Sequence, residues 1–210
     1  LYFSTNEILP EGAFLKNGLM CVRIGGKEFQ YRREISPLAG IHNTENLLSV
    51  LLISHIYGVE KEIIEEVLRS FRGLPHRVEL VRNIKGITFY NDSKATNVDA
   101  TKRVLESIDG NVILIAGGKD KGGSYAPIID HKDKMKALVL IGEARGRIVA
   151  ELGSYVDTYI EEDLKGAVER AYQVAKKEDV VLFSPMCSSF DMFRDYTERG
   201  NTFKKIVEAL

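Results

Sequence analysis

The stretch Ile87–Asn97, ITFYNDSKATN, decides the fold class of this chain. Its first five residues are mostly apolar or aromatic and predict a buried strand. Its last six are small, polar or charged, and apolar residues at helical spacing follow over Val98–Ser107. A strand that passes through a tight polar turn into an amphipathic helix is the repeating unit of an α/β fold.

The same alternation continues to the end of the chain. Further strands are predicted at Val112–Ala116, Ala137–Ile141 and Val180–Ser184. Further helices are predicted at Tyr125–Met135, Gly146–Leu152, Leu164–Lys176 and Asn201–Leu210. Because continuous apolar strands separated by amphipathic helices are typical of a sheet covered on both faces, the sequence predicts an α/β domain with a mostly parallel sheet.

A different pattern precedes Arg72-Gly73-Leu74-Pro75, so we place a boundary there, with one domain at 1–72 and the other at 73–210. Residues 1–35 are strand-like, with hairpin signals at Asn17-Gly18 and Gly25-Gly26. Two helices are predicted after them, at 43–57 and Glu60–Phe71. The chain opens with neither Met nor a signal-peptide layout, as if a strand were entered midway, and we expect a fragment that lacks its N-terminal portion.

The composition is that of a globular protein, with 44% hydrophobic and 28% charged residues among 210. The 29 basic and 30 acidic residues nearly cancel, which disfavours nucleic acid or an acidic membrane as a partner. Cys21 and Cys187 lie far apart without a CxxC pattern, as expected in a reducing compartment. We therefore expect a cytoplasmic protein, and the four histidines show no metal-ligand spacing.

In a parallel sheet, ligands bind beyond the carboxyl ends of the strands, so three strand exits are candidates for a site. The first, residues 90–97, combines a helix start with the charge of Lys94 and the hydroxyl of Thr96, which suits a carboxylate or phosphate. Asp92 could accept hydrogen bonds from ribose hydroxyls. The alternative for each of these residues is plain helix capping.

The second exit, residues 116–123, carries glycines and two lysines, Lys119 and Lys121, and could equally be a flexible solvated loop. The third, residues 184–193, presents Ser188 and Ser189, which can cap a helix or bind a carboxylate. Cys187 in that exit is interpreted as a small buried hydrophobe.

The segment His42-Asn43-Thr44-Glu45-Asn46 opens the first long helix. Asn43 and Asn46 share one helical face and could read the edge of an adenine, although the pattern alone favours an N-cap with a solvated face. Neither GxxxxGKS nor GxxxxGKT occurs in the chain, and GxGxxG is absent too.

Taken together, five segments resemble the Mur ligase family over essentially the whole chain. They are HNTEN (42–46), FRGLPHR (71–77), NDSKATN (91–97), GGKDKG (117–122) and the run from Ser184-Pro185 to Arg199-Gly200. The NDSKATN segment is similar to that of the members that add D-glutamate, since sister ligases usually carry a histidine-containing sequence there. Met186 and Ser188 stand where family members often have alanine.

The resemblance implies a three-domain parent enzyme. Residues 1–72 would be the C-terminal part of its central ATP-binding domain, and 73–210 its Rossmann-like C-terminal domain, which binds the amino acid. The implied activity is ATP-dependent addition of D-glutamate to UDP-N-acetylmuramoyl-L-alanine through an acyl phosphate, with ATP and Mg²⁺, in a monomer. The phosphate loop, the metal-binding carboxylates and a modified lysine would lie upstream of Leu1, so we expect no catalytic residue in this chain and no activity of the chain alone.

The resemblance also assigns two sets of residues. The D-glutamate set is Lys94, Thr96, Lys121, Ser189, Phe190 and Tyr196, and the nucleotide set is Asn43, Asn46, Arg77 and Asp92. Two rival functions stay open. One is a stand-alone nucleotide- or amino-acid-binding module without catalysis. The other is a dinucleotide-dependent oxidoreductase, which the absence of GxGxxG disfavours.

Overall fold

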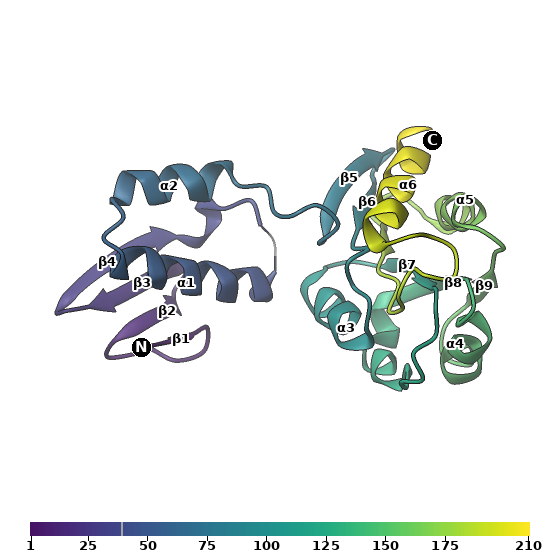
Figure 1. Ribbon diagram of the computed structural model, residues 1–210, viewed down its shortest axis with the longest axis horizontal. Helices are drawn as coiled ribbons and strands as arrows, with labels where there is room; N and C mark the ends of the chain where they lie inside the picture. The colour runs from purple at the N-terminus through teal and green to yellow at the C-terminus, as the bar shows by residue number, and fades with distance from the viewer. Residues whose placement is uncertain (39) are drawn as a thin grey trace. The chain divides into compact units, whose positions relative to one another are not determined.

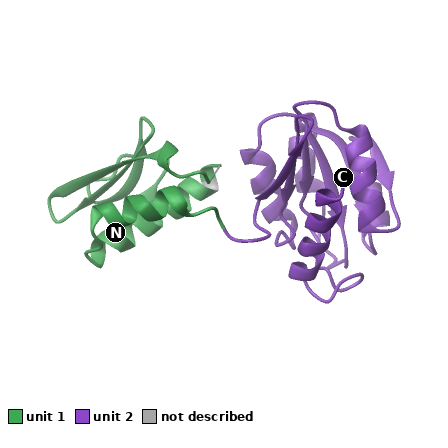
Figure 2. Cartoon of the chain, turned by 90° about the horizontal axis from the view of Figure 1, so that it is seen from above, with its two compact units in different colours: residues 1–73 green, residues 74–210 purple. Residues whose placement is uncertain are grey.

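The structure is a computed structural model that describes residues 1–38 and 40–210. The side chain of His42, in the predicted HNTEN segment, lies outside the described residues. The chain divides into two compact units, unit 1 at residues 1–73 and unit 2 at 74–210 (Figure 2). The division lies one residue from the boundary that the Gly73 and Pro75 signals predict.

Unit 1 contains a four-stranded sheet in the order β1-β2-β3-β4. Its strands are Tyr2–Ser4, Gly12–Lys16, Leu19–Ile24 and Lys27–Arg32. Strands β2, β3 and β4 pair antiparallel through the two predicted turns. Asn17 and Gly18 have φ of 49° and 76°, the left-handed conformation that a tight hairpin turn requires, so the hairpin prediction is confirmed.

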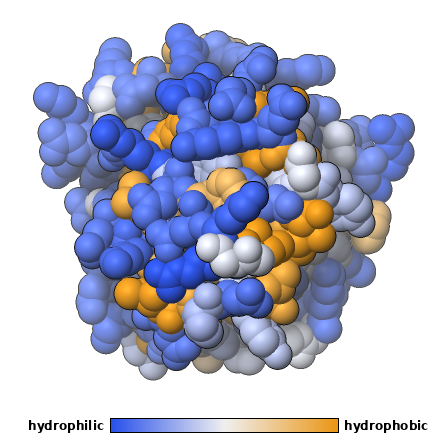
Figure 3. Space-filling model, turned by 90° about the vertical axis from the view of Figure 1, so that its left-hand side faces the viewer, coloured by the Kyte–Doolittle hydropathy of each residue, from blue (hydrophilic) through white to orange (hydrophobic). Residues whose placement is uncertain are grey.

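Two helices complete the core of unit 1. They are α1 (Ile41–Ile56) and α2 (Lys61–Ser70), after a short 3₁₀ helix at Arg33–Ile35. Their buried residues pack with strand residues in one cluster that includes Leu48, Leu51, Ile64, Met20 and Tyr31. Other apolar residues of both helices are exposed: Val50, Ile53, Ile56, Ile63 and Val67. A space-filling view shows apolar patches between polar residues on one face (Figure 3).

Unit 2 contains a six-stranded sheet in the order β5-β6-β10-β7-β8-β9. Its strands, in chain order, are β5 (Glu79–Ile84), β6 (Ile87–Asn91), β7 (Val112–Gly117), β8 (Met135–Ile141), β9 (Thr158–Ile160) and β10 (Val180–Phe183). All neighbouring pairs are parallel except β5–β6, which confirms the predicted mostly parallel sheet. The sequence did not predict the edge strands β5 and β9, because each is short or half polar and forms by pairing with a neighbour.

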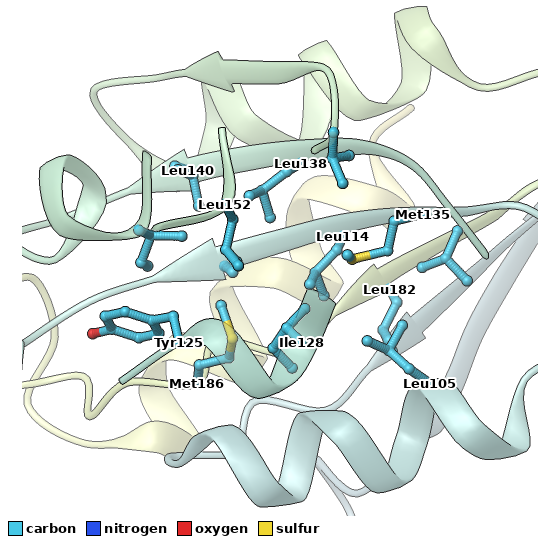
Figure 4. Packing of buried hydrophobic residues seen from close by; sticks show 14 of the residues in the cluster. Leu105, Leu114, Tyr125, Ile128, Met135, Leu138, Leu140, Leu152, Leu182 and Met186 are labelled. Carbon is cyan, nitrogen blue, oxygen red and sulfur yellow. The ribbon is translucent and has the colours of Figure 1, made fainter. Parts of the chain in front are cut away.

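Helices cover both faces of this sheet (Figure 1). The face that carries Leu114 packs against α3 (Val98–Ser107), the 3₁₀ helix η2 (Ala126–Lys134) and α4 (Arg145–Leu152). Figure 4 shows Leu105, Ile128, Leu114 and Leu182 meeting in that layer. The face that carries Ile113 packs against α5 (Leu164–Val174) and α6 (Tyr196–Glu208). Successive strand residues therefore enter two separate cores, as strand geometry dictates.

Two helices differ from their predicted form. The predicted helix Tyr125–Met135 is a 3₁₀ helix, in which a proline occupies the first turn and only Ile128 is buried. Helix α6 begins at Tyr196, five residues before the predicted Asn201, because the Asp195 carboxylate accepts a hydrogen bond from the amide of Glu198 (2.8 Å). Sequence reasoning overlooked this Asp-x-x-Glu capping pattern. Among the described residues, no helix is both long and apolar enough to cross a membrane.

Candidate functional site

The carboxyl ends of β6, β10 and β7 lie side by side at one edge of the sheet. Phe183, the last residue of β10, pairs with Asn91 of β6 on one side and with Ile115 of β7 on the other. Because the three strands run parallel, the three predicted exits leave the sheet at the same edge.

The second exit contacts the first through Lys121. Its Nζ donates a hydrogen bond to the carbonyl oxygen of Thr96 (2.8 Å), although Lys121 itself is exposed. Beside this contact is a cavity of about 260 Å³ between the start of α3 and the loop before η2. Its lining residues are Thr96, Asn97, Val98, Asp99, Lys121, Gly123, Ser124, Tyr125, Pro127 and Met186. A cation and a helix N-terminus at one cavity suit a carboxylate.

Lys94 contacts the beginning of α6. Its Nζ lies 3.9 Å from the centroid of the Tyr196 ring, within the range of a cation–π interaction. Two further bonds hold this turn: the Ser93 hydroxyl donates to the Tyr196 carbonyl (2.8 Å), and the Lys94 amide donates to the His76 carbonyl (3.0 Å). Lys94 therefore presents an exposed charge from a turn fixed to two other elements.

The third exit brings two more predicted residues to this edge. Ser189 is 2% exposed, and its carbonyl accepts hydrogen bonds from the amides of Met192 (3.1 Å) and Phe193 (2.8 Å). Phe190 is 72% exposed and does not line the cavity. The six residues of the predicted D-glutamate set thus lie as two contacting pairs, Thr96 with Lys121 and Lys94 with Tyr196, and two residues of the third exit.

The predicted nucleotide set is distributed over both units. Asn43 and Asn46 lie in the first two turns of α1 in unit 1, and Arg77 is exposed in unit 2. Asp92 is only 4% exposed. Its Oδ2 accepts from the Ser184 hydroxyl (2.8 Å) and its Oδ1 accepts from the Val78 amide (3.3 Å). Burial raises the pKa of this carboxyl to about 7.

Several buried polar residues that sequence reasoning left without a role hold the three exits together. His76 is 4% exposed, and its Nδ1 lies 2.9 Å from the Asn91 amide nitrogen. Arg199 is 1% exposed and bonds to Ser93 and Cys187. Arginine is mostly exposed in proteins and histidine is intermediate, so nothing in the local pattern predicts the burial of these two residues. A local signal for Arg199 is its position three residues after Tyr196, on the same face of a helix.

Among the described residues, no group of three or more His, Cys, Asp or Glu side chains is arranged to hold a metal ion.

Comparison with known proteins identifies the family. Residues 76–187, more than half of the chain, match the family described as "Mur ligase, glutamate ligase domain". The chain belongs to the Mur ligase family. The matched region begins at His76 and ends at Cys187, so it includes the first two strand exits and the start of the third.

Curated Mur ligases are similar along nearly all of the chain. It is 46% identical over 209 residues to a UDP-N-acetylmuramoylalanine--D-glutamate ligase of Geotalea daltonii, covering 99% of this chain and 46% of that protein. It is 46% identical over 187 residues to the protein of the same name from Bdellovibrio bacteriovorus, covering 89% of this chain and 40% of that protein. The chain thus spans about half the length of the curated relatives it matches.

Solved Mur ligase structures share the fold. The UDP-N-acetylmuramate-alanine ligase MurC of Thermotoga maritima matches with a TM-score of 0.66 at 16% identity, over 99% of this chain and 47% of that one. MurF of Acinetobacter baumannii matches with a TM-score of 0.67 at 14% identity, over 93% of this chain and 45% of that one.

Proposed function

We propose that this chain supplies the amino-acid site of an ATP-dependent amide ligase. In this proposal the enzyme adds D-glutamate to UDP-N-acetylmuramoyl-L-alanine during cytoplasmic synthesis of peptidoglycan precursors, and it acts as a monomer. One observation carries the proposal: lysines from two strand exits reach one sheet edge, Lys121 bonded to Thr96 and Lys94 over Tyr196. The name that the relatives share, at 40–46% identity, supports D-glutamate as the amino acid.

The chemistry explains why such an edge is needed. A carboxylate is a poor electrophile, so ATP first converts the carboxylate of the UDP substrate to an acyl phosphate. The amine of D-glutamate then attacks the acyl carbon, the new C–N bond forms, phosphate leaves and the amine loses a proton. The contribution of this chain is to hold the attacking amine in place through the two carboxylates of D-glutamate.

Each residue of the D-glutamate set has a role in this proposal. Lys94 and Lys121 donate hydrogen bonds to the carboxylates from charged groups, and the hydroxyls of Thr96 and Ser189 donate them from neutral groups. Tyr196 forms an apolar wall that also orients Lys94. Phe190, which is exposed in the structure, shields the site from solvent on the outer side.

The nucleotide set is proposed to contact ATP. Asn43 and Asn46 would read the adenine edge, Arg77 a phosphate, and Asp92 a ribose hydroxyl once the Ser184 hydroxyl releases it. Mg²⁺ is proposed as the metal of the whole enzyme, and none of the steps assigned to this chain depends on it. Two solved structures that share this fold are described with ADP or with AMPPNP and Mn bound, which supports a nucleotide in the reaction.

Binding to the chain tests the amino-acid site. In a calorimetric and NMR titration, D-glutamate should bind and shift the amide signals of Lys94, Thr96 and Lys121, while L-glutamate and D-glutamine should bind more weakly. Equal binding of D- and L-glutamate, or no binding, would contradict the proposal.

A chimera tests the reaction. The chain alone is expected to release no phosphate from ATP, because it contains no phosphate-loop sequence. Joined to the first half of the Geotalea daltonii relative, it should release phosphate only when D-glutamate and UDP-N-acetylmuramoyl-L-alanine are both present. D-glutamate binding without phosphate release from a folded chimera would favour a binding module without catalysis.

A further inference from the structure

A buried arginine lies where the three strand exits meet. Arg199 is on α6, one helical turn beyond Tyr196, and is 1% exposed. Its guanidinium carbon lies 5.9 Å from the centroid of the Phe183 ring, the last residue of β10. A full positive charge is therefore placed beneath the sheet edge that carries Lys94 and Ser189.

The guanidinium donates hydrogen bonds to the first and third exits and packs against the second exit. Its Nε donates to the hydroxyl of Ser93 (3.1 Å), and its Nη2 donates to the carbonyls of Ser93 (2.9 Å) and Cys187 (3.1 Å). Ser93 immediately precedes Lys94, and Cys187 lies two residues before Ser189. A methyl group added at Gly118 would lie 3.1 Å from Nη1, so the second exit also touches this group.

A contribution to stability does not explain why the charged side chain of Arg199 is buried at this position. In the described part of the chain Arg199 forms no ion pair with a carboxylate, and its Nη1 has no hydrogen-bond partner. Burial lowers the pKa of the guanidinium to about 10, so the group stays charged at neutral pH at a cost in desolvation. The planar, forked geometry of the donors is what an apolar side chain cannot reproduce.

We propose that Arg199 is a positioning residue of the amino-acid site, which sets the distance between Lys94 and Ser189 to match an amino acid with two carboxylates spaced as in glutamate. The inference rests on the proposed function, because it concerns the same ligand. Arg199 acts through Ser93 and Cys187 and does not contact the ligand itself. Lysine cannot substitute for it, since one ammonium group does not hold two loops in a fixed plane.

The test compares two ligands that differ by one methylene group. Binding of D-glutamate and D-aspartate is measured by calorimetry on the 210-residue chain and on Arg199→Lys and Arg199→Gln. The control is Arg194→Gln, which makes the same change at an arginine whose side chain is 82% exposed. Near-ultraviolet circular dichroism and urea unfolding confirm that each variant is folded.

The wild-type chain and Arg194→Gln should prefer D-glutamate. Both Arg199 variants should bind D-glutamate at least about tenfold more weakly, the factor that one charge-assisted contact to the ligand contributes. Their affinity for D-aspartate should change less, so the ratio of the two affinities falls. A purely structural role would weaken both ligands by one factor, in proportion to the folded fraction.

The outcomes are distinct. Failure of the wild-type chain to bind D-glutamate overturns the proposed function, and the positioning role with it, before any variant is used. Wild-type binding with an unchanged ratio in Arg199→Lys overturns the positioning role alone. If neither Arg199 variant folds, Ser93→Ala carries the test, because it removes the hydroxyl that accepts from Nε, and it should lower the same ratio.

Discussion

Asp92, which is predicted to contact the nucleotide, has a buried carboxyl group in the structure. Asp92 accepts the Ser184 hydroxyl, which in turn lies 2.8 Å from the Thr101 hydroxyl. These three side chains join β6, β10 and α3 beneath the candidate site. Burial opposes ionisation of Asp92 and raises its pKa to about 7, so its charge changes near neutral pH.

The first prediction concerns the pH dependence of stability. Below about pH 4 the carboxyl of Asp92 is protonated in both the folded and the unfolded chain. Between that value and its folded pKa of about 7, only the folded chain keeps the proton, so the free energy of unfolding falls as the pH rises. Asp92→Asn should remove about 2.7 kcal/mol of this fall between pH 5 and 8, because the fall covers about two pH units below the folded pKa at about 1.4 kcal/mol each.

Urea unfolding of the wild type and the variant at several pH values measures this difference. Asp109→Asn, at an exposed carboxyl, is the control and should leave the wild-type curve unchanged. Parallel curves for wild type and Asp92→Asn would show that Asp92 is ionised in the folded chain.

The second prediction concerns Lys94. Lys94→Ala should weaken D-glutamate binding at least about tenfold, because one charge-assisted hydrogen bond is worth about 1.5–3 kcal/mol. Nucleotide binding should change much less. Lys165→Ala on α5, where the lysine side chain is 71% exposed and pairs with Glu169, should change neither. Calorimetric titration distinguishes this result from a solvated turn lysine, whose removal would leave D-glutamate affinity within error.

At the scale of elements, the exit of β7 depends on a close approach of two backbones. Gly118 has a φ of 136°, and a methyl group added there would lie 2.4 Å from the carbonyl oxygen of Ser188. The Lys119 amide donates to that same carbonyl (2.9 Å). The second and third exits can therefore lie against each other only because residue 118 has no side chain.

The third prediction tests this approach. Gly118→Ala should lower the free energy of unfolding by at least about 2 kcal/mol, because it adds both a backbone clash and an unfavourable φ. Gly123→Ala lies in the same loop, with nothing within 4 Å of the added methyl group, and should change stability little. Urea midpoints of the two variants measure the contrast. Similar midpoints would mean that the loop moves to accept a side chain.

At the scale of the whole molecule, the two units differ in how completely they bury apolar residues. Unit 2 packs two cores, one on each face of its sheet. Unit 1 has a single core, and α1 and α2 leave Val50, Ile53, Ile63 and Val67 at least half exposed. Exposed apolar surface of this kind lowers solubility and contributes nothing to stability.

The fourth prediction follows from that contrast. Residues 74–210 expressed alone should unfold cooperatively in urea, at the midpoint of the corresponding transition in the full chain. Residues 1–73 alone should aggregate or bind a hydrophobic dye such as ANS. Non-cooperative unfolding of 74–210 would show that unit 2 requires unit 1 in order to fold.

Local sequence patterns predict much of the secondary structure of this molecule. The apolar run at Val112–Ala116, the hairpin turn at Asn17-Gly18 and the helix Val98–Ser107 depend on neighbours a few residues away, so the fold class and most strand positions could be predicted. The three strand exits followed from the parallel sheet, because parallel strands end at one edge. Edge strand β5 could not be predicted, since half of it is polar and it forms by pairing with β6.

The sequence by itself therefore determined the order of elements, the fold class and the three segments that carry the candidate site. Tertiary structure alone decided which side chains at that edge are buried. Arg199 meets Ser93 across 106 positions, and Ser184 meets Asp92 across 92. Contacts between residues so far apart in sequence produce no periodic pattern from which they could be predicted. The desolvation that raises the pKa of Asp92 and lowers that of Arg199 arises only when distant segments pack together.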